Sequence, residues 1–386
     1  MDVRELTEDI KRRARALGFD LVGISSAGPL PDGQRYKNWL SMGHAGEMHY
    51  LERRVERRED VRNIVPGAKS VITCGLNYNT DAPYSTSCRD NGKGWIARYA
   101  WGDDYHDVMD EKLSSLSEFI RAGAPGTAEI MRYSDTGPVL ERAHARYGGA
   151  GWIGKNTCLI NQETGSWVFL GELITDLELE YDSPVPDRCG TCTRCIDACP
   201  TGALTAPYTL DSRLCISYLT IELKDKIPFD LRDGVGSNIF GCDICQDVCP
   251  WNRKAPVTDE PSFQPRPGLF NPGLGTVASL CPEEFRALFK GSPVKRTKQR
   301  GLIRNALVAI GNSSDTDFVP VVTECLGDEE PLVRIHALWA LWKLEGKGAL
   351  RSLLSARDSE SDQSVLEELD YLLELIQKPE RLKASG

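Results

Sequence analysis

The stretch RCGTCTRCIDACPTGAL, Arg188 to Leu204, indicates which fold the middle of this chain adopts, because its four cysteines follow the spacing Cys-x2-Cys-x2-Cys-x3-Cys-Pro. A second run, FGCDICQDVCPWN at residues 240–252, contains the same Cys-Pro pair. In two-cluster ferredoxins, the first three sulfurs of such a run bind one iron–sulfur cube and the fourth binds the other. The two runs therefore predict a ferredoxin-like domain over residues 181–260.

Eight cysteines are available once Cys215, which lies between the two runs, is included. Two 4Fe-4S clusters need that number of ligands. The crossed pattern assigns one cluster to Cys189, Cys192, Cys195 and Cys249, and the other to Cys199, Cys215, Cys242 and Cys245. A pair of zinc sites is the alternative, although zinc sites usually show two separated Cys-x2-Cys pairs.

The composition is typical of a protein from a reducing compartment that is large enough to bury its own core. The chain has 386 residues and 13 cysteines, and it contains no apolar run of membrane-spanning length. We therefore expect a cytoplasmic protein with no membrane contact, whose clustered cysteines bind metal. The formal net charge of −10 argues against general affinity for nucleic acid.

Hydrophobic periodicity divides the rest of the chain into two further parts. Residues 1–180 alternate helix and strand patterns and predict a mixed α/β domain, in which 157–161 and 166–174 form a hairpin. Residues 275–386 are helical, and the Ala-Leu-x-Ala-Ile pattern at 306–310 recurs 31 positions later as Ala-Leu-x-Ala-Leu. Short HEAT-like repeats explain that period, and a plain helical bundle is the alternative.

One carboxylate stands out in the α/β part. Asp135 directly follows a predicted strand and precedes Gly137 and Pro138, so its side chain can face a cleft at a turn. The nearby loop GGAGWIGKN is rich in glycine, which lets the backbone approach a large ligand closely. Position alone makes Asp135 a turn residue more often than a catalytic one. No G-x-G-x-x-G follows a predicted strand, so a dinucleotide site is not expected.

Over residues 1–260 the sequence resembles the epoxyqueuosine reductases of tRNA modification. The resemblance is carried, in order, by SDTGPVLERAHA, GWIGKNTCLIN, GSWVFLGEL, the first cysteine run, CISYLTIE and the second cysteine run. It implies a cobalamin-dependent iron–sulfur enzyme that reduces the epoxide of epoxyqueuosine, at the wobble position of a tRNA, to queuosine. The implied fold is a multidomain α+β protein, whose N-terminal α/β corrinoid-binding domain resembles that of reductive dehalogenases.

The resemblance also implies roles for individual residues. Asp135 matches the family's proton donor, which must be protonated near pH 7 and therefore needs surroundings dry enough to raise its pKa from about 3.9. DYHDVM at 104–109 lacks the glycine of D-x-H-x-x-G, so we expect base-off cobalamin, with His106 lining the pocket. Besides Asp135, the implied corrinoid contacts are Arg58, Arg98, Lys155, Asn156, Thr157, Cys158, Ser217, Cys242 and Asp243.

A tRNA substrate gives a purpose to the one basic segment of the chain. Residues 285–314 carry seven basic side chains and no acidic one, which otherwise describes a solvated helix face. The expected phosphate contacts are Lys224, Lys295, Arg296, Lys298 and Arg300. An external electron donor is the second expected partner. Two alternatives are a corrinoid enzyme that acts on a small molecule, which would not need a basic tail, and a ferredoxin-type carrier, which would not need the α/β domain.

Overall fold

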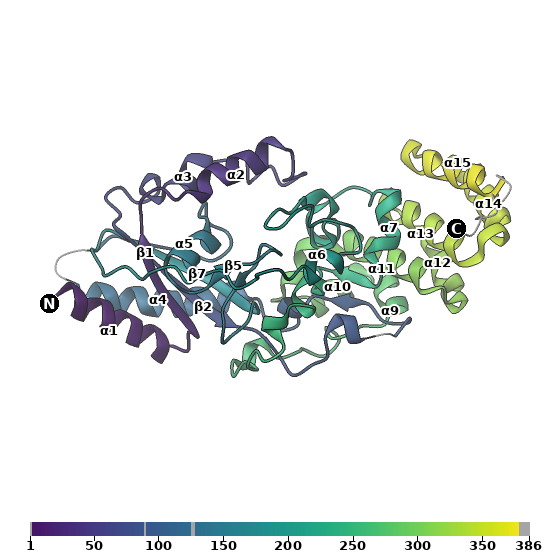
Figure 1. Cartoon of the computed structure of the whole chain (residues 1–386). Coiled ribbons are helices and arrows are strands. Elements are labelled where there is room, and N and C mark those ends of the chain that lie inside the picture. Colours follow the sequence, from purple (N-terminus) through teal and green to yellow (C-terminus); the bar gives the residue numbers. More distant parts are fainter. Residues whose placement is uncertain (1, 89, 125–127, 378–386) are drawn as a thin grey trace. The chain divides into compact units, whose positions relative to one another are not determined.

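The computed structural model of the chain describes residues 2–88, 90–124 and 128–377. These residues form two compact units (Figure 1). Unit 1 consists of Met1–Ser87, Arg98–Cys215 and Asp243–Arg266, and unit 2 of Cys88–Ala97, Ile216–Cys242 and Pro267–Gly386. Both cysteine runs lie almost wholly in unit 1. The three predicted domain boundaries stay a prediction.

Unit 1 is built on a four-stranded antiparallel sheet. Its strands follow the order β1 (Leu21–Ser26), β2 (Ser70–Asn77), β7 (Val168–Thr175) and β4 (Ile130–Tyr133). All eight residues of β2 are buried, because the strand is hydrogen-bonded on both sides and covered on both faces. The sequence pattern predicted each of these strands.

The predicted hairpin is wrong in its pairing. Strand β6 (Leu159–Ile160) pairs with β5 (Trp152–Ile153), while β7 pairs with β2 and β4. An isolated antiparallel bridge pairs Asn161, the last residue of the first predicted arm, with Gly165, the residue before the second arm. The eight-residue β7 can pair along its full length with β2, whereas β6 offers two residues, so the long-range pairing forms more hydrogen bonds.

Helices cover both faces of the sheet. Helices α1 (Val3–Ala16) and α4 (Tyr105–Gly123) lie together on one face, and α5 (Glu141–Tyr147) lies on the other (Figure 1). The apolar stripe that predicted α4 is buried, at Met109, Leu113, Leu116 and Ile120. The remaining helices of unit 1 are α2 (Asp32–Ser41), α3 (Val55–Glu59), α6 (Arg194–Asp197) and α8 (Ile244–Asp247).

Unit 2 is mainly helical. Its two short strands, β3 (Trp95–Ile96) and β8 (Asn238–Phe240), pair in parallel. A π-helix spans Tyr218–Glu222, and the α-helices are α7 (Phe229–Val235), α9 (Leu274–Ala278), α10 (Pro282–Leu288), α11 (Lys298–Ser313), α12 (Val319–Cys325), α13 (Pro331–Glu345), α14 (Leu350–Ser359) and α15 (Gln363–Gln377). Within the described ranges, no helix is both long and apolar enough to cross a membrane.

The repeated sequence pattern marks the helices that form the core of unit 2. Ala306 to Ile310 lie in α11 and Ala337 to Leu341 in α13, and all of them are buried where these two helices pack together. Leu369 and Leu372, in the third and most degenerate copy, are buried in α15, which packs on α13. Each helix therefore buries its apolar side against the next, as stacked helical repeats do.

Candidate active site

Asp135 lies at the end of β4 in a backbone conformation that few residues adopt. Its φ is +58°, in the left-handed region. Two hydrogen bonds hold the residue: its amide donates to Glu141 Oε1 at 2.5 Å, and Tyr105 Oη donates to its Oδ2 at 3.0 Å. Helices α5 and α4 thus fix this turn from both sides of β4, and they direct the carboxyl group towards the first turn of α4.

His106 stands beside that carboxyl group. Its Nδ1 is 2.7 Å from Asp104 Oδ1, and its Nε2 is 3.7 Å from Asp135 Oδ2. Burial acts to lower the pKa of His106, but the hydrogen bond to Asp104 and the nearby carboxylate of Asp135 outweigh burial and raise the pKa to about 9. The ring is therefore cationic at neutral pH. Both ring nitrogens face carboxylates, consistent with a pocket-lining role.

The dry surroundings expected for Asp135 are not provided by the polypeptide alone. Its side chain is 56 % exposed, although Tyr105 and His106 cover one side of it. A bound cofactor or substrate would have to exclude water from the other side. What the chain itself provides is the neighbouring imidazolium, which holds a proton within reach of Asp135.

The loop at 154–158 holds the two cysteine runs together. Lys155, 9 % exposed, donates from Nζ to the carbonyls of Gly190 at 2.7 Å and Cys192 at 3.0 Å. Asn156 Nδ2 donates to the carbonyl of Cys245 at 3.3 Å. Lys155 is therefore not a surface charge. It fixes the first run, while its neighbour fixes the second.

Two further residues of this loop complete the connection. Thr157 has a φ of +65°, and its carbonyl accepts a hydrogen bond from Arg142 Nη1 at 2.5 Å. A hydrogen bond with Cys245 lowers the pKa of the Cys158 thiol against the opposing effect of burial. Cys158 therefore contacts a predicted cluster ligand, rather than being a strand residue packed in the core.

Four cysteines from the two runs act on one another's pKa values or pack together. Cys195 lies close enough to Cys189 and Cys192 for their charges to raise its pKa further, after burial, which is the main cause. Burial likewise raises the pKa of Cys249 to about 11, with Cys189 and Cys195 among its charged neighbours. Cys249 and Cys189 also pack together around Trp152. This supports one cluster on these four residues.

The surroundings of Cys189 suit a metal-bound thiolate. Burial raises the pKa of Cys189, while the Lys155 amide and the Trp152 indole N–H act to lower it. Trp152 packs against Cys189, and its buried Nε1 has no hydrogen-bond partner among the described residues. Hydrogen bonds to sulfur are a usual feature of iron–sulfur sites.

Across the described residues, no three His, Cys, Asp or Glu side chains are arranged around a single metal ion. The thiolates of a cube are spaced differently, because each binds its own iron atom.

Arg98 serves the fold. Its side chain is 1 % exposed and donates to the Thr80, Ala82 and Pro83 carbonyls at 2.9 to 3.1 Å. The Arg98 amide donates to Asp243 Oδ2 at 2.7 Å, and Asp243 is itself 2 % exposed. The Arg98 guanidinium is therefore not a surface charge, and its predicted contact with the corrinoid stays a prediction. This residue instead orders the backbone beside Asp243.

The other predicted corrinoid contacts lie in other elements. Arg58 lies in α3, and its Nη1 donates to the carbonyl of Arg53 at 2.7 Å. Ser217 precedes the π-helix, and Cys242 follows β8, both in unit 2. Their roles stay predictions.

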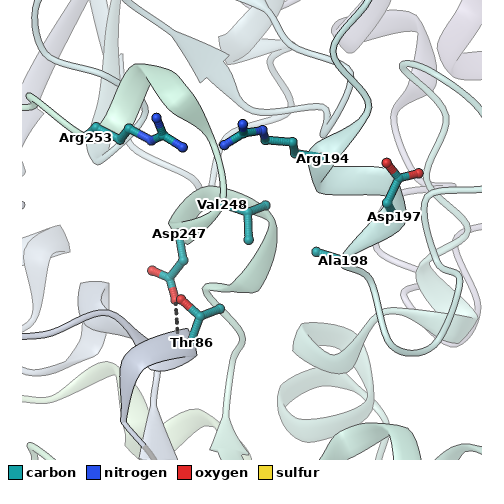
Figure 2. Close-up of a pocket in the computed structure, with 7 residues that line it drawn as sticks. All are labelled: Thr86, Arg194, Asp197, Ala198, Asp247, Val248 and Arg253. Carbon is teal, nitrogen blue, oxygen red and sulfur yellow. Dashed lines mark hydrogen bonds between the residues drawn. The ribbon is translucent and has the colours of Figure 1, made fainter.

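A pocket of about 500 Å³ lies beside α6 and α8, the two helices that carry Cys195 and Cys245. In Figure 2, Arg194 and Arg253 extend towards each other across it, while Asp247 turns to Thr86, whose amide donates to Asp247 Oδ2 at 3.2 Å. Sequence reasoning did not identify this pocket, because its lining comes from three separate segments.

The predicted tRNA contacts lie in unit 2, and most are close together. Lys224 Nζ is 3.4 Å from the carbonyl of Arg296, and the positive charges of Arg296 and Lys298 add to burial in lowering the pKa of Lys224. Arg300 pairs with Glu330 at 3.3 Å. Arg304, from the same basic segment, is 0 % exposed and donates to carbonyls of the 219–225 segment, so the segment is not one continuous basic surface.

Sequence reasoning missed Glu141 and Glu172. Glu172 is 0 % exposed on β7, and Glu141, on α5, binds the amide of Asp135. The signal that could have identified Glu172 is its position as the one charged residue of the largely apolar stretch SWVFLGELI.

Family models match three parts of the chain. "Epoxyqueuosine reductase QueG, DUF1730" matches residues 58–136, a 4Fe-4S double cluster binding domain matches 188–252, and HEAT repeats match 298–378. The ferredoxin-like and HEAT-like predictions, and with them the multidomain α+β fold, are confirmed.

Whole-length relatives give the same result. The epoxyqueuosine reductase of Xanthomonas campestris is 41% identical over 343 residues, which is 88% of this chain and 96% of that protein. The Escherichia coli enzyme is 37% identical over 342 residues, 88% of this chain and 90% of that protein.

Solved structures of such enzymes share the fold. One, determined with an epoxyqueuosine-modified tRNA-Tyr stem loop, has a TM-score of 0.90 and 32% identity, and the match covers 98% of this chain and 100% of that one. Another, from Bacillus subtilis, has its catalytic aspartate loop swung out of the active site, with a TM-score of 0.87, 32% identity and coverage of 97% and 100%.

Proposed function

Because the chain belongs to the epoxyqueuosine reductase family, we propose that it reduces the epoxide of epoxyqueuosine in tRNA to queuosine. The reaction adds two electrons and two protons to the epoxide, breaks both of its C–O bonds, and releases the oxygen as water. The observation that carries the proposal is the 154–158 loop of unit 1, which binds the backbone of both cysteine runs. The electron source and the α/β unit that holds Asp135 are thus joined by direct contacts.

Electrons pass through two 4Fe-4S clusters in this proposal, after an external donor reduces them. Cys189, Cys192, Cys195 and Cys249 hold one cluster, which the packing of Cys249 against Cys189 supports. Cys199, Cys215, Cys242 and Cys245 hold the other. Lys155 and Asn156 keep both loops in place by binding their carbonyls.

Base-off cobalamin, when bound, would supply a low-valent cobalt for breaking the C–O bond. Thr157, Cys158 and Asp243 are the residues of unit 1 that we assign to it, joined by Ser217 and Cys242. The left-handed Thr157 exposes a tight turn of backbone, which suits close contact with a large planar ligand. Asp243 and Cys158 are near neighbours, since the charge of Asp243 acts on the pKa of Cys158.

Asp135 delivers a proton to the epoxide oxygen. The imidazolium of His106, 3.7 Å away, is placed to return a proton to Asp135. Tyr105 orients the carboxyl group through its hydroxyl. We further propose that the loop of Asp135 can move out of the site, because the catalytic aspartate loop of the Bacillus subtilis relative is swung out of its active site.

The tRNA lies along Lys224, Lys295, Arg296, Lys298 and Arg300, which contact phosphates. The wobble base must leave its stack to reach a buried cofactor, so these contacts have to hold the neighbouring backbone. Lys224 lies close to Arg296 and Lys298, which supports a single phosphate-binding surface.

The test is reconstitution of the full chain with iron, sulfide, cobalamin, a chemical reductant and epoxyqueuosine-containing tRNA, followed by nucleoside analysis for queuosine. We expect Asp135→Asn to slow a single turnover by about a hundredfold or more, because general acid catalysis contributes roughly that factor. Iron content, corrinoid binding and tRNA affinity should stay unchanged.

Asp110→Asn is the matched control, because Asp110 is an exposed carboxylate on α4 that pairs with Arg132. It should react like the wild type. Undiminished turnover in Asp135→Asn would remove Asp135 as the donor. A chain that bound corrinoid but not tRNA would instead indicate a small-molecule enzyme, and one that bound neither would indicate an electron carrier.

A further inference from the structure

Glu172 is an ionisable residue in the middle of the buried sheet. It is 0 % exposed on β7, directly opposite Thr73 of β2, on the face that α5 covers. Neither of its carboxyl oxygens has a hydrogen-bond donor among the residues described, and Thr73 Oγ1 is also unpartnered. A buried carboxylate without donors is costly, so a carboxyl group in this place must be neutralised.

The neighbour that can neutralise Glu172 is Glu141. Helix α5, which carries Glu141, packs on β7, which carries Glu172, and each of the two residues acts on the pKa of the other. Two carboxylates, however, have no proton to share. A single proton resolves the conflict, since a protonated Glu172 then donates to an ionised Glu141. Burial raises the pKa of both residues, and in each the charge of the partner or of Asp135 raises it further. We call these two residues the carboxyl pair.

Four titratable or charged groups of the described residues act on the carboxyl pair or are acted on by it. From α5, Arg142 acts to lower the pKa of Glu141. Asp135, in the loop, acts to raise the pKa of Glu172. Glu141 acts to raise the pKa of Tyr105 on α4, and Glu172 acts to raise the pKa of Cys74 on β2. Tyr105 and Cys74 stay neutral, because burial raises the pKa of each. The charge of Asp135 opposes a second negative charge on the pair, and of these four groups Arg142 alone favours one.

The carboxyl pair is tied to the active site by one short contact. Glu141 Oε1 accepts the amide of Asp135 at 2.5 Å. Asp135 is in the left-handed conformation, which costs a non-glycine residue about 1 kcal/mol and persists where neighbours hold it. We propose that the carboxyl pair, sharing one proton, holds the Asp135 loop in its reactive position and releases it when that proton is lost.

The proposal deepens the function proposed above and rests on Asp135 being the proton donor. Glu141 and Glu172 are positioning residues, because they act through the backbone of Asp135. When the shared proton leaves, two buried carboxylates repel each other, and the side chain of Glu141 can escape to solvent by leaving the Asp135 amide. Raising the pH should therefore open the loop even without tRNA.

Hydrogen–deuterium exchange on the reconstituted full-length enzyme without tRNA tests this directly. After correction for the intrinsic rate, protection of residues 134–140 should fall about tenfold or more between pH 7 and pH 9 in the wild type, the factor expected for one lost hydrogen bond. In Glu172→Gln the side-chain amide donates to Glu141 permanently, so protection should change less than about twofold. Glu141→Ala should already be unprotected at pH 7.

Two further variants complete the design. Thr73→Val alters the packing beside Glu172 without altering the carboxyl pair, so it should keep the wild-type dependence on pH. If Glu172→Gln does not fold, Glu141→Gln serves instead, because it keeps an oxygen acceptor for Asp135 but cannot ionise.

The same pH dependence in Glu172→Gln and the wild type, or full protection of Glu141→Ala at pH 7, would overturn the proposal. A fully active Asp135→Asn would refute the donor role but would leave the exchange result standing, so the two failures can be told apart.

Discussion

At the scale of single residues, two buried basic side chains of unit 1 bind backbone carbonyls. Lys155 and Arg98 both lie in stretches predicted to face a cofactor, yet each is buried and directs its donors at carbonyl oxygens. A buried cation is stable where it is fully hydrogen-bonded, and such bonds to a charged group contribute about 1.5–3 kcal/mol each. We therefore expect both side chains to act on the site through the backbone that they hold.

This role of Lys155 can be tested through cluster stability. Lys155→Met leaves the carbonyls of Gly190 and Cys192 without their donor, so the loop that carries Cys189 and Cys192 should loosen. We expect iron release to a chelator to become about tenfold faster, as for other substitutions behind metal ligands. Lys254→Met is the control, because Lys254 is exposed in the same unit. Equal release rates in both variants would contradict the role.

At the scale of elements, the order of the helical repeats is fixed by side chains that bridge their turns. Arg334 in α13 binds Glu360, at the end of α14, with two hydrogen bonds of 2.7 and 2.8 Å, and it also donates to the carbonyl of Asp328. Glu360 in turn accepts the amide of Asp362, which precedes α15. One ion pair thus links α13 to the turn between α14 and α15.

This link should depend on pH in a defined direction. The hydrogen bonds from Arg334 lower the pKa of Glu360 from 4.5 to about 2. Because the folded-state pKa is depressed, the stabilisation is complete above about pH 4.5 and is lost as the pH falls towards 2. Glu360→Gln should cost about 1–2 kcal/mol at pH 7, since the side chain is 8% exposed and weakly screened.

Melting curves of wild type and Glu360→Gln at several pH values measure this. The difference between them should be constant from pH 8 to about pH 5 and shrink below that. A difference that grew on acidification would contradict the assignment. Glu367→Gln, an exposed glutamate on α15, should match the wild type throughout.

At the scale of the whole molecule, the proposed function requires a net-acidic chain to bind a polyanion. The formal charge is −10, so binding depends on a local basic surface rather than on overall attraction. The surface is also smaller than the sequence suggests, because Arg304 is buried and Arg296 and Arg300 pair with Glu222 and Glu330. A confined surface favours one bound orientation over indiscriminate binding.

The salt dependence of tRNA binding tests this surface. The double variant Lys295→Ala, Lys298→Ala removes two exposed cations. We expect weaker binding and a log–log slope against salt that is shallower by about 1 to 2 units, since each lost phosphate contact lowers the slope by about one. The double variant Lys347→Ala, Arg351→Ala, also exposed in unit 2, should leave the slope unchanged. Anisotropy titrations at increasing KCl measure both.

The sequence by itself determined the elements whose cause is local. Regular spacing of apolar residues predicted α4, the four long strands and the repeated helices, because burial of one face needs that spacing. The cysteine runs likewise predicted the cluster domain, because three sulfurs must reach one cube from a short loop.

Only the tertiary structure decided which long-range partners meet. The choice of β2 over β6 as the partner of β7, and the contact of Glu141 with Asp135, depend on competing pairings between distant segments. The same holds for the roles of Lys155 and Arg98, whose charges suggested surface or ligand contacts until their burial was known. A residue's chemistry can be read from the sequence, but its partners are set by the folding of segments that lie far apart in the chain.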